Sequence, residues 1–109
     1  MSIRTPFAAA QDVTIAVTGA TAVTISKSAY NATIPTLTGN ATLTVTAGTD
    51  LEPGSYFSLV IKTTATETFT FAGDIVAPVV TGSAGKTWSQ AFVFNGTKFY
   101  PAGAKIQVD

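Results

Sequence analysis

The chain has 109 residues, enough for one domain with a small core. Charged residues make up 11% of it, and six basic and six acidic side chains, scattered singly, balance to a net charge of zero. No basic patch opposes a phosphate backbone, and no apolar run reaches the roughly 18 residues of a membrane span, so we expect neither nucleic acid nor membrane as a partner. The lack of cysteine and histidine excludes a disulfide framework, a thiolate metal site and a histidine base.

The first eleven residues, Met1–Gln11, are predicted to form an extended arm. Pro6 keeps the residue before it out of the helical region. The arm carries the apolar residues Ile3 and Phe7 and the only arginine of the chain, Arg4, and we expect it to pack on a neighbouring subunit through these side chains. The apolar run after the proline is shorter than a signal-peptide core, so we expect the chain to stay in the cytoplasm in which it is made.

Threonine makes up nearly a fifth of the chain, which favours strands because a β-branched side chain fits a pleated surface. After the arm, apolar and polar residues alternate in Asp12–Thr18 and again in Thr21–Ser26. With Gly19–Ala20 as a tight turn between them, these segments are predicted to pair as a hairpin. Thr33–Leu37 is also extended, and Pro35 makes it an edge or bulged strand.

The rest of the chain repeats this alternation between turns. Pro53–Gly54 marks one turn, and Asn95–Gly96 predicts a type I′ hairpin. Tyr56–Lys62 is the most apolar strand and is expected at the centre of its sheet. The predicted strands of this part are Asn40–Thr46, Tyr56–Lys62, Glu67–Ala72, Val76–Thr81, Thr87–Phe94, Thr97–Tyr100 and Lys105–Val108.

No window shows a helical period, and no linker or fixed repeat divides the chain. The regular spacing of turns predicts an all-β fold, a single-domain antiparallel β-sandwich or jelly-roll-like barrel of about eight short strands. This domain would span residues 12–109, preceded by the arm, residues 1–11. Its core is expected to contain Ile15, Val17, Val23, Ile25, Leu43, Val45, Phe57, Leu59, Ile61, Phe69, Phe71 and Phe92.

Few side chains offer chemistry. Asp50 and Glu52 lie in one loop and would supply oxygen ligands to calcium, but the alternating acids of a calcium loop are absent, which favours a solvated turn. The serines have no histidine to act as a base, and no Ser–Lys motif replaces it. We therefore expect no catalytic, cofactor-binding or metal-ligating residue, and no enzyme activity.

The aromatic residues leave two interpretations open. On a surface they would stack on a sugar, whereas inside a β-sandwich they would pack the core and the turns, and packing is the favoured role. The residues concerned are Tyr30, Tyr56, Trp88, Phe99 and Tyr100.

The order of motifs in Gly39–Tyr100 is more specific than any of the motifs alone. Six motifs follow one another in this stretch: a Gly-Asn strand, a Pro-Gly turn and strand, an aromatic-Thr-aromatic strand, an apolar-Pro segment, an Ala-Gly-Lys loop and an Asn-Gly hairpin. They are Leu37–Val45, Pro53–Ile61, Phe69–Phe71, Ala77–Val80, Ala84–Lys86 and Phe92–Phe99. This order resembles a module of tailed-bacteriophage head fibres, head decoration proteins and tail fibres. The module often carries tryptophan where this chain has Phe71 or Phe99, and residues 1–38 lie outside the likeness.

The resemblance implies a structural protein, which in many members is trimeric. Because the chain has no fibre shaft, heptads or Gly-X-Y repeat, it is more similar to a capsid decoration (cement) protein than to a tail fibre. Such a protein binds the major capsid protein on the outer surface of the head and stabilises it. We expect a homotrimer on the capsid exterior, with Ile3, Arg4 and Phe7 at the capsid or subunit interface. The alternative is a receptor- or glycan-binding tip of a head fibre or tail fibre, with a host surface glycan as partner.

Overall fold

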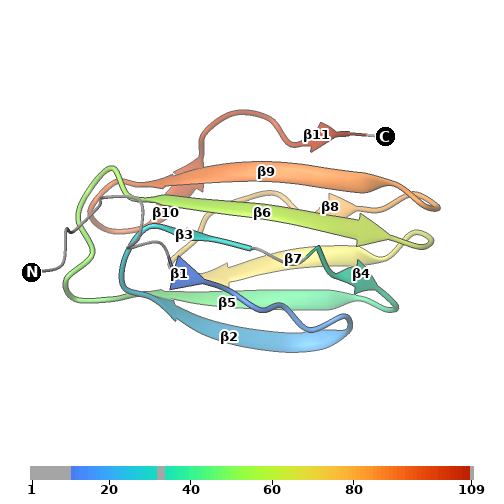
Figure 1. Ribbon diagram of the computed structural model, residues 1–109, viewed down its shortest axis with the longest axis horizontal. Helices are drawn as coiled ribbons and strands as arrows, with labels where there is room; N and C mark the ends of the chain where they lie inside the picture. The colour runs from blue at the N-terminus through green and yellow to red at the C-terminus, as the bar shows by residue number, and fades with distance from the viewer. Residues whose placement is uncertain (1–10, 32–33, 109) are drawn as a thin grey trace, which may run out of the picture.

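The computed structural model describes residues 11–31 and 34–108, and every regular element in these ranges is a β-strand (Figure 1). The predicted all-β class is confirmed. The described part of the chain contains no helix, and hence none long and apolar enough to cross a membrane. The strands are β1 (Gln11–Asp12), β2 (Gly19–Ile25), β3 (Ala29–Tyr30), β4 (Thr36–Leu37), β5 (Ala41–Ala47), β6 (Tyr56–Thr63), β7 (Thr68–Gly73), β8 (Val80–Thr81), β9 (Thr87–Phe94), β10 (Phe99–Pro101) and β11 (Ile106–Gln107).

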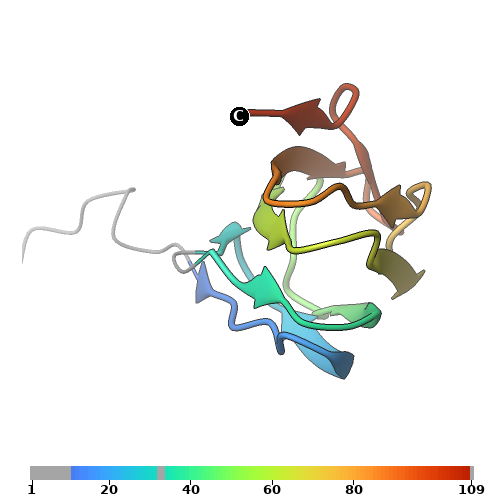
Figure 2. The ribbon, with the colours of Figure 1, turned by 90° about the vertical axis from the view of Figure 1, so that its right-hand side faces the viewer.

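These strands form two sheets, which Figure 2 shows in end view. Sheet A has seven strands in the order β1-β3-β6-β9-β10, with β4 also paired with β6 and β11 also paired with β9. Sheet B has four strands in the order β2-β5-β7-β8. The predicted pair of packed sheets is confirmed, whereas a closed barrel is wrong. The number of strands exceeds the predicted eight because several strands are only two residues long.

The chain crosses from one sheet to the other after almost every strand up to β7 (Figure 1). As a result, β1, β3 and β6 run parallel in sheet A, and β2, β5 and β7 run parallel in sheet B. Partner residues of these parallel strands lie 18 to 28 residues apart in the sequence, so the winding leaves no fixed repeat. Five of the nine pairings among the described strands are parallel, and the predicted antiparallel architecture is therefore wrong for this part of the chain.

The predicted hairpin within residues 12–26 is wrong for the same reason. Gly19–Ala20 begins β2 instead of forming a turn, and β2 pairs with β5. Of the preceding segment, Val13 and Ile15 are buried, but Val17 is 43% exposed and does not belong to the core. A glycine between two alternating segments looks the same in sequence whether the chain turns back within one sheet or crosses to the other.

The last predicted hairpin exists, but its turn differs. Phe94 of β9 pairs with Phe99 of β10, which leaves a loop of four residues. No described residue other than glycine has positive φ, so Asn95 does not fit the predicted type I′ turn. Its Oδ1 instead accepts hydrogen bonds from the backbone N–H groups of Thr97 and Lys98, both at 2.9 Å. Asn95 therefore acts through its side chain, as in an Asx turn.

From residue 40 onward most predicted strands are confirmed. Thr87–Phe94 matches β9 at both ends, and Tyr56–Lys62 is extended by one residue in β6. β6 lies between β3 and β9, in the interior of its sheet as expected. Val76–Thr81 is the exception, because only its last two residues pair as a strand, β8.

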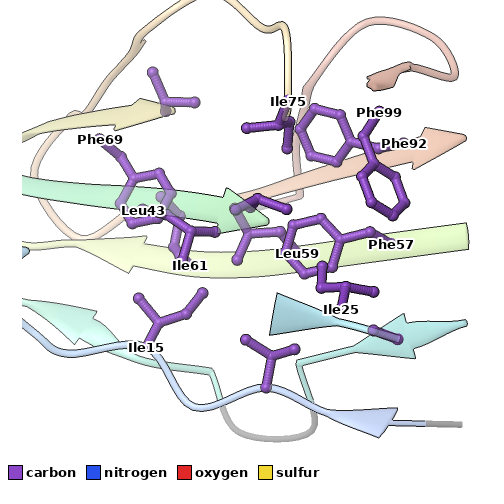
Figure 3. Close-up of a cluster of buried hydrophobic side chains, with 14 of the residues drawn as sticks. Ile15, Ile25, Leu43, Phe57, Leu59, Ile61, Phe69, Ile75, Phe92 and Phe99 are labelled. Atoms are coloured by element: carbon purple, nitrogen blue, oxygen red, sulfur yellow. The ribbon is translucent and has the colours of Figure 1, made fainter. Parts of the chain in front are cut away.

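The core lies between the two sheets (Figure 3). Phe57 of β6 stacks on Phe92 of β9 with ring centroids 5.7 Å apart, and Phe99 meets Phe57 edge-on at 6.1 Å. Val23 and Phe71 are partly buried against this cluster. Nine of the twelve predicted core residues are buried: Ile15, Ile25, Leu43, Val45, Phe57, Leu59, Ile61, Phe69 and Phe92.

Two local contacts join the edges of the sheets. On one side, Ile75 forms a β-bridge with Phe99, which ties the segment after β7 to β10. On the other side, the side-chain amide of Gln11 in β1 donates to the carbonyl of Thr24 in β2 (2.9 Å) and accepts from the N–H of Ser26 (3.0 Å). The sandwich is therefore held at both edges without a continuous ladder around it.

The turn between β6 and β7 is organised by Glu67, which is 9% exposed. Its Oε1 accepts from the backbone N–H groups of Thr64 (2.9 Å) and Ala65 (3.0 Å), and its Oε2 accepts from the Thr64 hydroxyl (2.7 Å). These hydrogen bonds, first that from Ala65, favour the ionised form and lower the pKa of Glu67 below 4.5, although its desolvation opposes the shift.

The core assignment predicts a large cost for shortening Leu59, which is 2% exposed in the middle of β6. Leu59→Ala should lower the free energy of unfolding by about 2–5 kcal/mol, because it leaves a cavity between the sheets. Urea unfolding would measure this, with Ser58→Ala, on the outward side of the same strand, as control. A loss below roughly 0.5 kcal/mol would contradict the facing of β6.

The Glu67 turn predicts a pH dependence. Because the pKa of Glu67 is lower in the folded than in the unfolded chain, its contribution is complete above pH 4.5 and is lost as the pH falls through the folded pKa. Glu67→Gln should therefore lower the urea midpoint at roughly pH 7, and lower it much less at about pH 3. Glu52→Gln, an acid-to-amide change in an exposed loop, is the control. Equal losses at both pH values for Glu67→Gln would contradict the prediction.

Candidate functional site

The candidate functional site is the outer face of sheet A. Residues alternate along β6, so that Phe57, Leu59 and Ile61 point into the core and the residues between them point outward. The pairing of β6 with its neighbours, and of β9 with β10 and β11, then places twelve residues on the outward side in four rows, and of these Thr87 is buried. These rows, which define the outer face of sheet A, are Tyr56–Val93–Tyr100, Tyr30–Ser58–Ala91, Val60–Ser89–Ile106 and Thr36–Lys62–Thr87.

This face carries a cluster of exposed apolar side chains. Nine large hydrophobic residues are exposed among the described ones, and four of them lie in the rows, including Tyr56 (59%) and Ile106 (60%). Two more, Ile34 and Val108, lie two residues from Thr36 and Ile106. Single exposed hydrophobic residues need no explanation, but a cluster of them on one face marks an interaction site.

Three tyrosines give the face its chemical character. Tyr56 and Tyr100 share one row, with the half-buried Val93 between them, and Tyr30 lies in the next row. A tyrosine offers an apolar ring together with a hydroxyl group that donates and accepts hydrogen bonds. Such a row can pack against an apolar protein surface or stack on a sugar ring.

Charge is sparse on this face. Lys62, which is half-buried, is the only charged residue among the twelve, and Asp12 of β1 continues the row of Tyr30 at the edge of the sheet. Contacts made here would therefore depend on apolar and aromatic area rather than on electrostatic steering.

The outer face of sheet B is chemically different. Its rows are made of small side chains: Ala20–Thr42–Thr70, Ala22–Thr44–Ala72 and Thr24–Thr46. This surface has no large apolar residue. The two faces of the sandwich are thus not equivalent, and the aromatic face is the better candidate for binding.

The predicted sugar-stacking set is divided by the fold. Trp88 pairs with Ile61 on the inner side of sheet A and packs partly buried against the core, and Phe99 is fully buried. The indole Nε1 of Trp88 donates to the hydroxyl of Thr63 (3.3 Å), which is fully buried. A packing role is therefore confirmed for Trp88 and Phe99, while the three tyrosines lie on the outside.

The remaining candidates from the sequence are the arm residues and the acidic residues of one loop. Ile3, Arg4 and Phe7 of the arm lie outside the described residues. Asp50 and Glu52 are exposed in the loop between β5 and β6, and the described ranges contain no group of three His, Cys, Asp or Glu residues that could hold a metal ion.

Sequence reasoning missed the aliphatic side chain that β11 adds to the outer face, Ile106. Ile106 joins this face only because β11 pairs with β9 opposite Ser89. The alternation of a two-residue strand gives no signal for its partner or its facing, so this part of the face was accessible only from the structure.

Comparisons with protein-family models, with curated proteins and with solved structures found no match.

The facing of the aromatic residues predicts a contrast between two substitutions. Trp88→Ala should lower the free energy of unfolding by about 2 kcal/mol or more, because it removes apolar contacts and the bond to Thr63. Tyr56→Ala should cost less than about 1 kcal/mol, because its side chain is largely exposed. Thermal and urea unfolding would measure both, and a larger loss for Tyr56→Ala than for Trp88→Ala would contradict the assignment.

Proposed function

We propose that this protein is a structural virion protein, a decoration (cement) protein that binds the major capsid protein on the outer surface of a phage head and stabilises the head. The observation that carries the proposal is the apolar, nearly uncharged outer face of sheet A. Such a face is typical of a surface that is covered by a partner. The resemblance of Gly39–Tyr100 to phage virion modules supplies the kind of partner.

The physical basis of stabilisation is selective binding. A protein that binds the assembled shell, and not the free shell protein, stabilises the assembled state by mass action. Each large apolar side chain contributes roughly 1.5–3 kcal/mol when it is fully buried. Because the face has a single lysine, docking would desolvate few charges.

The proposal includes a homotrimer on the exterior of the virion, made in the host cytoplasm before it joins the head. Icosahedral shells offer many positions of local three-fold symmetry, which a trimer matches. The arm, with Ile3, Arg4 and Phe7, would add contacts to sister subunits or to the shell, because an apolar side chain on an extended segment gains from burial only at an interface.

A receptor- or glycan-binding tip of a phage fibre is the second candidate. The exposed tyrosines Tyr30, Tyr56 and Tyr100 favour it, because aromatic rings with hydroxyl groups suit the apolar faces and the hydroxyl edges of sugars.

Co-sedimentation with empty expanded capsids tests the first proposal. Tyr56→Lys combined with Tyr100→Lys should weaken binding by about tenfold or more, because it would bury two charges at the interface. Thr46→Lys, on the exposed outer face of sheet B, is the matched control and should bind normally. No co-sedimentation of the unmodified protein at any salt concentration would overturn the proposal. Binding to host polysaccharide that is lost in Tyr56→Ala or Tyr100→Ala would favour the second candidate instead.

A further inference from the structure

Strand β2 forms an open edge of sheet B. In a parallel ladder, the N–H and C=O groups of one residue point to the same neighbouring strand, and those of the next residue point away. Gly19 donates its N–H to Asn40 (3.0 Å), and the carbonyl of Ile25 accepts from Gly48 (2.8 Å), so odd-numbered residues of β2 face β5. The even-numbered residues therefore direct their backbone groups outward: Ala20, Ala22 and Thr24.

One end of this edge is already filled by a side chain. The Gln11 amide donates to the Thr24 carbonyl and accepts from the Ser26 N–H. It thus makes the two hydrogen bonds that one residue of an added parallel strand would make with these groups. Within the described residues no strand lies beside Ala20 and Ala22 on this side, because β2 is the outermost strand of sheet B.

The remaining edge has neither charge nor proline to prevent strands from pairing, and the Ala16 N–H that reaches it donates to the hydroxyl of Thr21 (3.1 Å), not to the backbone of Ala20 or Ala22. Residues 18–26 contain no charged residue and no proline, and the first charged residue after them is Lys27. The side chains of Ala20 and Ala22 are small and exposed. Native edges are normally protected by charge, proline, a bulge or a cover. A seven-residue strand without them can accept an extended segment by β-augmentation.

We infer that residues 2–8 of a second copy of this chain add to sheet B as a strand beside Ala20 and Ala22. This segment contains four apolar residues, two hydroxyl residues and one arginine, which suits an uncharged edge. Pro6 has no N–H group, so its backbone must lie on the side of the added strand that faces away from β2. Because backbone groups alternate between the two sides of a strand, the N–H groups of Thr5 and Phe7 then face β2. The proline is therefore compatible with pairing on one side.

The direction of β1 indicates that the segment added to β2 comes from a second copy and not from the same chain. Gln11 donates its backbone N–H to Ser28 (2.8 Å) and pairs with Ala29, so the chain enters sheet A at this residue. β1 and β2 point in opposite directions in Figure 1, and Gln11 contacts the carboxyl end of β2. Gln11, the first described residue, therefore lies at the carboxyl end of its own β2, whereas Ala20 lies at the other end of that strand.

A segment given to one neighbour and received from another is a head-to-tail contact, which closes into a ring if the rotation allows. This inference rests on the homotrimer in the proposed function, with three copies in the ring, but not on capsid binding.

Disulfide mapping tests the inference cleanly, because the chain has no cysteine of its own. Ala22→Cys would be mixed with Thr5→Cys or with Ala8→Cys, which sample the two faces of an added strand, and oxidised near micromolar concentration. We expect a mixed disulfide with at least one of these donors, several-fold above that formed by Thr97→Cys, a control acceptor in the exposed β9–β10 loop. No mixed disulfide above the control, or an Ala22→Cys homodimer in its place, would overturn the inference.

A double variant that combines Ala22→Cys with the donor that cross-links, Thr5→Cys or Ala8→Cys, distinguishes exchange between copies from pairing within one chain. A covalent ring of three supports the inference, whereas a monomer closed on itself overturns it. Ala22→Lys places a charge at the edge and should shift the trimer-to-monomer midpoint in light scattering by about tenfold in concentration. Thr46→Lys, on the same face but in the interior strand β5, is its control. An unchanged trimer in Ala22→Lys would also overturn the inference.

Capsid co-sedimentation of the same preparations separates the two proposals. Cross-linking without capsid binding would refute the decoration role alone, and capsid binding without cross-linking would refute the strand exchange alone.

Discussion

The facing of β6 is the constraint on which the rest of the structure depends. Phe57, Leu59 and Ile61 are almost fully buried, and β6 pairs with β3 and β4 on one side and with β9 on the other. Once these three side chains face sheet B, the pairing with β9 turns Phe92 inward and Val93 outward. The core and the aromatic outer face therefore follow from a single choice, and a one-residue slip of β6 would exchange them.

A second constraint is the management of strand edges. A sandwich of short strands exposes unpaired backbone groups wherever a sheet ends. Ile75 and Phe99 connect the sheets at one side, and the Gln11 amide does so at the other, where it replaces a missing peptide group. The Gln11 amide satisfies only the carboxyl end of β2, which leaves the outward backbone groups of its amino-terminal half open.

The sequence predicted where strands lie in the chain better than it predicted which strands pair. Alternation in Tyr56–Lys62 and Thr87–Phe94 reports local pleating and burial, and both strands are confirmed. Pairing depends on residues far apart in the sequence. At Gly19–Ala20 the predicted hairpin was wrong because a glycine is compatible both with a hairpin turn and with a crossing to the other sheet. For the site, the three tyrosines were considered from the sequence, but their separation from Trp88 required the pairing of β6 with β9.

The two surfaces singled out by the structure share no residue. The aromatic face belongs to sheet A, and the open edge belongs to β2 of sheet B. Copies joined through the edge would therefore leave the outer face of sheet A free on each of them. An assembly whose subunits present several identical apolar faces gains affinity through multivalency, because each face after the first binds at a high effective concentration. A small, nearly uncharged domain can in this way bind a repetitive shell firmly with modest contacts per copy.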